Sequence, residues 1–355
     1  MKLKPLALTL AGLAAAPAFA QSNVAIYGRL DYGLMSRNGD SGAVPDDTNG
    51  KTEFASGIAG GSRIGFRGSE DLGNGLKAVF ELEYGIRVDQ GTTTSTTWGN
   101  RHSWVGLEND MGRIIGGRID GLRYNTMFNK FDPFGVVTLG NFAQLTPQID
   151  RYDNAVMYIS PKMKGLTVSG VYSNQAEGQE GDGNRGDNRL LGALLFYENG
   201  PLNLGASYEY YWTQGAADNK LWFATFGASY DFEVVKLYAL FDKIQSDDGN
   251  TLVTGLDQKS WLVGVKAPVG KSVDVRAMYG QTYVDEFNGQ DADDMDASKW
   301  GIGMDYKLSK RTYFYADYGS IHNDDNAANT IGPAGTNYLG GYGTRGFDVG
   351  MAHRF

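Results

Sequence analysis

The chain has 355 residues, no cysteine and a formal net charge of −9 at pH 7. A chain without cysteine has neither a disulfide scaffold nor a thiolate metal site, and its three scattered histidines argue against a histidine-rich metal centre. A pI near 4.9 makes it a poor partner for nucleic acid. Fifty glycines, 21 tyrosines and 17 phenylalanines with only 9 prolines favour a β-protein, either a membrane barrel or a soluble secreted sandwich.

The first 20 residues have the pattern of an export signal. Lys2 and Lys4 form a basic start, residues 6–16 are apolar, and Ala18-Phe-Ala20 is a small-x-small cleavage site. We expect a signal peptide over 1–20 and a single domain over 21–355, because no linker interrupts the rest. No later apolar run approaches the roughly 18–20 residues that a membrane-spanning helix needs.

In the first half of the chain, apolar and polar residues alternate with the period of two that is typical of β-strands. In 24–34 the apolar side chains share one face, which leaves Arg29 and Asp31 on the other. Around Trp104 the alternation predicts Arg101 and Ser103 inside. A charge on the lipid face costs roughly 2–4 kcal/mol at the bilayer midplane, so the polar face is expected to line a lumen. The inward charges predicted in this way are Arg29, Asp31, Arg63, Arg67, Glu81, Glu83, Arg101, Arg151, Asp153 and Arg276.

Four of these arginines lie on neighbouring strands and predict a basic ladder in one sector of the lumen: Arg29, Arg63, Arg101 and Arg151. Each arginine taken alone is equally consistent with a solvated wall residue or a local ion pair. The ladder therefore depends on their recurrence from strand to strand.

The long connection 119–150 is unusually apolar, with the sequence FNKFDPFG at 128–135. Long loops in compact proteins are usually functional. We expect this loop to fold into the barrel and narrow it, rather than to pack only at the mouth. Asp132 would then face the arginine ladder, and opposed charges would set a transverse field across the path of a solute.

The second half of the chain supplies further alternating strands with aromatic residues at the ends of the apolar face and aliphatic residues in the middle. Such bands are expected at the two interfaces of a membrane. These strands lie near 202–212, 222–230, 261–267 and 300–306. A helix would instead place apolar residues at i, i+3 and i+4.

Short and long connections alternate along the chain. Seven short turns, which begin near residues 70, 109, 161, 198, 231, 268 and 308, separate eight longer polar stretches. This count predicts about 16 strands in an all-β, antiparallel, up-and-down transmembrane barrel. A barrel of that size encloses a water-filled channel.

The chain ends on a strand whose apolar parity runs to the last residue. That parity contains Phe347, Val349, Met351, His353 and Phe355. An exposed aromatic strand edge invites aggregation in a soluble protein. A closed membrane barrel removes the problem, because the last strand pairs with the first and its aromatic face meets lipid.

No enzyme motif is found, and no cofactor is expected. A Ser–His hydrolase would need a histidine in the lumen or at the rim, yet His102 and His353 both fall on the predicted lipid parity. His322 lies at a strand end beside an acidic loop. The acidic outer loops are expected to form a solvated mouth rather than a Ca²⁺ site, since 291–296 lacks EF-hand spacing.

Several segments resemble the Gram-negative trimeric general porins, particularly those of β-proteobacteria. The resemblance spans the mature chain, and SRIGFRGSEDLGNGLKAVFELE at 62–83 is its most specific part. The other matching segments are VAIYGRLDYGL (24–34), RHSWVGLENDMGRIIGGR (101–118), RYDNAVMYISPKMKGLTV (151–168) and GMAHRF (350–355).

This resemblance implies a 16-stranded homotrimeric barrel in the outer membrane, with loop three (the connection 119–150) as the constriction. It implies passive diffusion of small hydrophilic solutes and ions, contact with outer-membrane lipid and lipopolysaccharide, and insertion by the barrel-assembly machinery through a C-terminal signal that includes His353 and Phe355. The constriction residues implied are Arg29, Arg63, Arg101, Arg151, Asp132 and Glu83. Enterobacterial relatives carry Pro-Glu-Phe-Gly on this loop, whereas here 132–135 reads Asp-Pro-Phe-Gly.

The sequence thus predicts a non-specific diffusion channel in which basic groups outnumber acids at the constriction, with a resulting preference for anions. Acidic outer loops oppose that preference over a Debye length of roughly 8–10 Å. The nearest alternative is a substrate-selective channel that uses Arg276, Tyr124 and Phe128. A barrel enzyme and a plugged structural or adhesive barrel are further alternatives.

Overall fold

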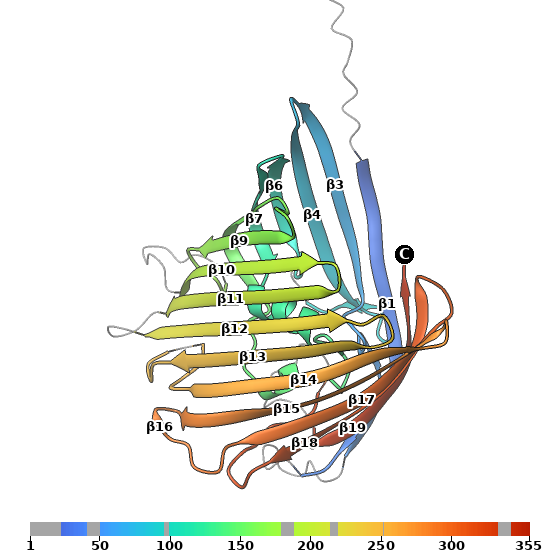
Figure 1. The fold of residues 1–355 in the computed structure, drawn as a ribbon, viewed down its shortest axis with the longest axis vertical. Helices are drawn as coiled ribbons and strands as arrows, with labels where there is room; N and C mark the ends of the chain where they lie inside the picture. The colour runs from blue at the N-terminus through green and yellow to red at the C-terminus, as the bar shows by residue number, and fades with distance from the viewer. Residues whose placement is uncertain are drawn as a thin grey trace, which may run out of the picture.

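A computed structural model describes residues 23–40, 50–95, 99–178, 188–213, 219–250, 252–332 and 342–355. Its strands form one antiparallel sheet that closes on itself, because β1 pairs with β19 on one side and with β3 on the other. Figure 1 shows the strands side by side around the barrel and the C-terminus beside β1. The predicted signal peptide lies outside the described residues.

Sixteen strands make up the wall, as the sequence predicted. They are β1 (Asn23–Asn38), β3 (Arg63–Gly73), β4 (Leu76–Arg87), β6 (Ser103–Asn109), β7 (Gly112–Asp120), β8 (Arg151–Ile159), β9 (Leu166–Ser173), β10 (Asn188–Asn199), β11 (Leu202–Thr213), β12 (Lys220–Asp231), β13 (Lys236–Ser246), β14 (Asp257–Val269), β15 (Val273–Phe287), β17 (Ala297–Lys307), β18 (Thr312–Asn323) and β19 (Arg345–Arg354). Three short strands lie at the end of the barrel with the long loops: β2 (Lys51–Ser56) pairs with β1, β5 (Thr92–Thr93) with β4, and β16 (Gln290–Asp291) with β15.

All seven predicted short turns join consecutive wall strands, from the β3–β4 hairpin to the β17–β18 hairpin. Antiparallel strands joined in this way put these turns, Asn23 and Phe355 at one end of the barrel, here called the turn end. The chain closes the seam there, because Gly28 and Phe355 exchange backbone hydrogen bonds of 3.1 Å in each direction.

The outer wall is apolar and the inner wall is polar. Ile26, Val105 and Phe226 are more than half exposed on the outer face, whereas their strand neighbours of opposite parity are buried or face the lumen. Backbone groups inside a bilayer find no water, so a closed sheet that pairs every strand is a stable spanning structure. Among the described residues no helix is long and apolar enough to cross a membrane.

Loop three, which runs from 121 to 150 between β7 and β8, folds into the barrel as predicted. It contains the π-helical segment η2 (Leu122–Phe128), the single turn α1 (Asn129–Phe131) and the 3₁₀ turn η3 (Phe142–Leu145). The loop's large apolar side chains are almost completely buried against the inner wall: Met127, Phe128, Phe131, Leu139, Phe142 and Leu145. Apolar surface removed from water stabilises this position.

Glycines on the inner wall make the space that loop three occupies. A Cβ added at Gly227 would lie 2.1 Å from the ring of Phe131, and one at Gly280 would lie 2.6 Å from Phe142. The wall glycines that loop three approaches in this way are Gly205, Gly227, Gly264, Gly280, Gly301, Gly303, Gly319 and Gly346. Part of the high glycine content therefore serves close packing of the loop.

Arg123 anchors the start of loop three to the wall. Its Nε and Nη2 donate to the two carboxylate oxygens of Asp242 at 2.8 and 2.7 Å, and its Nη1 donates to the carbonyl of Pro147 at 2.7 Å. The rings of Phe128 and Phe223 flank the guanidinium at 4.8 and 4.7 Å. This arginine is 2% exposed, and its charge is cancelled within the protein.

Asp132 holds the middle of the loop. Its carboxylate accepts hydrogen bonds from the backbone N–H of Phe134 at 2.8 Å and of Phe142 at 2.7 Å. Burial raises the pKa of Asp132 to about 7, because a charged carboxylate is costly away from water. The carboxylate therefore organises the loop's own backbone. Among the described residues it forms no ion pair with the arginines that the sequence placed opposite it.

Candidate pore constriction

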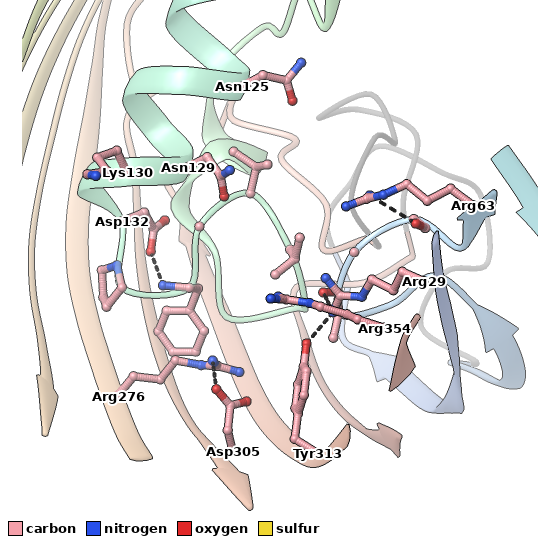
Figure 2. A pocket seen from close by; sticks show the side chains of 18 of the residues that line it. Arg29, Arg63, Asn125, Asn129, Lys130, Asp132, Arg276, Asp305, Tyr313 and Arg354 are labelled. Carbon is pink, nitrogen blue, oxygen red and sulfur yellow. Dashed lines mark hydrogen bonds and ion pairs between the residues drawn. The ribbon is translucent and has the colours of Figure 1, made fainter. Parts of the chain in front are cut away.

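A cavity of about 780 Å³ lies between loop three and the opposite wall. In Figure 2, Arg29, Arg63 and Arg354 lie on one side of it, and Arg276 and Asp305 lie on the other. Loop three contributes residues 132–137 to its surface. All six residues that the sequence associated with a constriction line this cavity: Arg29, Arg63, Arg101, Arg151, Asp132 and Glu83.

The barrel seam places three arginines in one row. Arg29 on β1 is the register partner of Arg63 on β3 and of Arg354 on β19. Like charges directly opposite each other destabilise a sheet. Arg29 donates to the Ala59 carbonyl and the Tyr313 hydroxyl, and it lies 3.8 Å from Asp31. Within the described part of the chain, its buried Nε has no hydrogen-bond partner.

Glu83 forms ion pairs with two of the lumen arginines, Arg63 and Arg101. Its Oε2 lies 3.2 Å from Arg63 Nε, and its Oε1 lies 2.5 Å from Arg101 Nε. Glu83 is 2% exposed, whereas both arginine side chains remain partly open to the cavity. One carboxylate therefore fixes two guanidinium groups while cancelling only one of their charges.

Arg151 and His102 extend the cluster toward loop three. Arg151 Nε lies 3.1 Å from an oxygen of Asp120, and its Nη1 donates to Asp150. His102 lies between two carboxylates, with Nε2 2.7 Å from Asp120 and Nδ1 2.9 Å from Glu81. The acids nearest the arginines are thus on the wall and at the ends of the loop.

The predicted lipid-facing position of His102 is wrong, because its side chain faces the lumen. In β6 the lipid-facing parity belongs to Val105 and Leu107, which are 64% and 50% exposed, so Trp104 points inward. Residues 99–102 lie outside the strand, and period-two alternation does not apply there. Arg101 does line the cavity, although the alternation around Trp104 does not account for it.

The opposite wall is also basic, but Arg276 is neutralised there. Its guanidinium lies 2.9 Å from Asp305 and 2.8 Å from Asp317, and it stacks over Phe134 of loop three at 5.0 Å. Of the other side chains proposed for a selective channel, Tyr124 lines the cavity, whereas Phe128 is 0% exposed and belongs to the packing of the loop.

Basic residues outnumber acidic ones around the cavity by twelve to six. The cations are Arg29, Arg63, Arg101, Lys130, Arg151, Lys236, Lys266, Arg276, Lys307, Lys310, Arg311 and Arg354; the carboxylates are Glu83, Asp120, Asp132, Asp150, Asp274 and Asp305. The formal charge of the lining is therefore 12 − 6 = +6, although the whole chain carries −9.

Arg354 and the lysines near the turn end line the cavity but were not predicted from the sequence. The alternation of the last strand already puts Arg354 on the polar face. Its position beside Arg29 follows only from the register across the closed seam. Phe355 packs on that seam, where its ring fills the space beside Gly28, and His353 Nδ1 lies 2.9 Å from Thr312 Oγ1.

Within the part of the chain that the structure describes, one group of side chains has ligand atoms close enough to hold a metal ion: Glu81, Glu83 and His102, within 4.8 Å of one another. Arg63 and Arg101 already pair with Glu83, and His102 contacts both Glu81 and Asp120. Cations of the protein therefore occupy the positions that a metal would take, and the group does not fit a metal site.

The sequence and the fold match known outer-membrane proteins. A family model described as Gram-negative porin matches residues 7–326. An outer membrane porin protein of Bordetella pertussis is 34% identical, over 88% of this chain and 92% of the relative. Outer membrane porin protein 32 of Delftia acidovorans is 31% identical, over 99% and 100% of the two chains.

Among solved structures, the anion-selective porin from Comamonas acidovorans superposes with a TM-score of 0.77 at 27% identity, covering 94% of this chain and all of that one. The family match covers most of the chain and agrees with the closed 16-stranded barrel. The chain therefore belongs to the Gram-negative porins, and it is a general diffusion channel of the bacterial outer membrane.

Proposed function

We propose that this porin prefers anions and that Arg29, Arg63, Arg101 and Arg151 form the basic side of its constriction. The observation that carries the proposal is the +6 formal charge of the cavity lining. In a narrow lumen with low-dielectric walls, such a charge concentrates anions and repels cations. The similarity to the anion-selective porin from Comamonas acidovorans supports the same sign of selectivity.

Loop three sets the opening that faces these arginines. The wall glycines, the Arg123–Asp242 pair and the backbone hydrogen bonds of Asp132 hold the loop in place. Asp132 contributes by holding the loop, and Glu83 contributes by orienting Arg63 and Arg101. A solute moves down its own gradient past fixed charges, so the proposal includes no catalytic step and no cofactor.

The assembly and targeting parts of the proposal come from the family. We propose a homotrimer, a cleaved signal over residues 1–20, and a C-terminal assembly signal that includes His353 and Phe355 and is recognised by the barrel-assembly machinery. Lipid and lipopolysaccharide would contact the apolar outer wall. Cross-linking of the folded protein in outer-membrane fractions tests the trimer, and the mass of the exported chain tests the cleavage site.

The reversal potential across a planar bilayer in a KCl gradient tests the selectivity. We expect the sign of an anion-selective channel and conductance that appears in steps of three. Neutralising Arg29, Arg63 and Arg101 one at a time should move the potential toward zero. A cation-selective sign would refute the anion preference, and a protein without conductance would refute the open channel.

A further inference from the structure

A second row of cations crosses the wall opposite Arg29, Arg63, Arg101 and Arg151, here called the arginine cluster. Lys236 on β13 is the register partner of Lys266 on β14, which is the register partner of Arg276 on β15. All three side chains line the cavity. As at the seam, the sheet places like charges directly opposite one another, which costs stability.

The carboxylates near this row cancel only part of its charge. Arg276 is neutralised by Asp305 and Asp317. Asp274 is shared, at 3.4 Å from Lys266 and 2.7 Å from Lys307. Asp305 also lies 3.9 Å from Lys266. Three carboxylates therefore face four cations (the row and Lys307), which leaves 4 − 3 = one positive charge.

The remaining cation of the row is Lys236, whose register partner on β12 is Asp231. In the described part of the chain it has no ion pair, and its ammonium lies over the Tyr238 ring at 5.2 Å. Lys310 and Arg311, in the adjoining turn, also line the cavity without an ion pair in that part of the chain. With Lys310 and Arg311 included, six cations face these three carboxylates, so this side of the lumen carries 6 − 3 = three positive charges in excess.

We propose that Lys236, Lys266 and Lys307, here called the lysine cluster, form a second anion site that binds oxyanions carrying two or more negative charges. The inference rests on the proposed anion preference and specifies the solutes that benefit most. Lysine ammonium groups are mobile point charges that do not demand a planar ligand, so charge number rather than shape governs binding. Phosphorylated solutes and small dicarboxylates share the required chemistry.

The position of the cluster gives it a place in the path of a solute. Lys236 and Lys266 lie near the turn end of their strands, and Lys307 is the last residue of β17. Arg354 of the seam row is likewise the last residue of β19, so both basic walls of the cavity reach the turn end. An anion that passes between them meets the lysine cluster on one side and the arginines on the other, and several weak contacts hold a multivalent anion without one deep energy well.

Block of the chloride current by sulfate tests the inference in the full-length channel. Sulfate is the divalent probe, malonate is a dicarboxylate, and methanesulfonate is a monovalent anion of similar shape to sulfate. We expect saturable block by sulfate and malonate alike, at concentrations about tenfold below those needed for methanesulfonate. Block that does not depend on charge number would overturn the proposal, as would block by sulfate alone.

The double variant Lys236→Gln/Lys266→Gln locates the site. The concentration of sulfate for half-block should rise about tenfold, whereas Lys271→Gln, an exposed lysine at the same end that does not line the cavity, should leave it unchanged. The single variant Lys307→Gln should give a smaller rise and serves if the double variant does not fold. An unchanged half-block concentration in a variant that still conducts chloride would overturn the inference.

The same recordings separate the two proposals. A wild-type channel that is anion-selective in KCl but is not blocked by sulfate would retain the proposed function and reject the lysine cluster. A cation-selective wild type would reject the anion preference itself. Sulfate block that disappears only when Arg29 or Arg63 is replaced would assign the binding to the arginine cluster.

Discussion

Two buried arginines of this porin have opposite surroundings. Arg123 is 2% exposed and has a carboxylate partner, Asp242, that is 0% exposed. Arg29 is 6% exposed and is the register partner of Arg63 and Arg354. Its Nε has no hydrogen-bond partner among the described residues. The first arginine holds loop three on the wall, and the second lines the cavity beside that loop.

The difference lies in where the charge of each arginine acts. A guanidinium whose donors and charge are satisfied inside the protein stabilises one arrangement of the chain. A guanidinium beside like charges costs stability, but its uncancelled field reaches the solutes in the lumen. Replacing the first should therefore change the shape of the pore, and replacing the second should change its selectivity.

The largest effect is expected from Asp242→Asn, which leaves Arg123 as a buried charge without its counter-ion. Loss of one member of a buried ion pair costs about 3–5 kcal/mol. Loop three should lose its anchor, so that single-channel conductance rises and becomes noisy while the thermal unfolding temperature falls. Asp231→Asn at the exposed end of β12 is the control, and equal behaviour of the two variants would contradict the anchoring role.

Gly227→Ala tests the seat of loop three without changing a charge. A Cβ at this position would lie 2.1 Å from the Phe131 ring, and overpacking of this kind costs about 1–3 kcal/mol. We expect the loop to move toward the lumen, with lower conductance at unchanged selectivity. Gly170→Ala on β9, where a Cβ meets nothing within 4 Å, should behave as wild type.

Arg29→Gln and Glu83→Gln should shift the reversal potential in opposite directions. The first lowers the formal charge of the lining from +6 to 6 − 1 = +5, and the second raises it to 6 + 1 = +7. Arg29 also donates to the Ala59 carbonyl and the Tyr313 hydroxyl and lies beside the buried Asp31, so its removal should lower the free energy of unfolding by about 1–3 kcal/mol.

A matched control for these charge variants is Arg189→Gln. Arg189 stacks on Trp212 at 5.4 Å and does not line the cavity. Its replacement should not move the reversal potential. Shifts of the same sign for Arg29→Gln and Glu83→Gln would show that the fixed charges of the lining do not set the selectivity.

The smallest effect on the channel current is expected from the titration of Asp132, which acts on stability. Burial raises its pKa from 3.8 to about 7, so over that pH interval the folded protein keeps a proton on this carboxyl that the unfolded chain has released. The corresponding stabilisation is fully present below pH 3.8 and is lost as the pH rises through 7. The thermal unfolding temperature of the wild type should fall as the pH rises across this interval. Asp132→Asn should remove the part of that fall that this carboxyl causes. An identical slope in the variant would assign the titration elsewhere.

The sequence alone was sufficient for the strand count, the seven turns and the inward direction of Arg29, Arg63 and Arg151. The strand count and the turns follow from the alternation of short and long connections, and the direction of the arginines follows from alternation within a strand. Both are local properties of the chain. The apolar composition of loop three also predicted that it folds inward, since burial of its phenylalanines outweighs exposure to water. Where the chain leaves strand geometry, at 99–102, the same reasoning misplaced His102.

Only the tertiary structure decided which charges meet. Arg354 lies beside Arg29 because β19 pairs with β1 when the barrel closes at the seam. Lys236 lies beside Lys266 because of the register between β13 and β14. Wall glycines far along the chain receive loop three, and the carboxylate of Asp132 turns to backbone N–H groups. Alternation is fixed by the chemistry of neighbouring residues, whereas register and docking depend on hydrogen bonds and packing among residues that meet only after the barrel has closed.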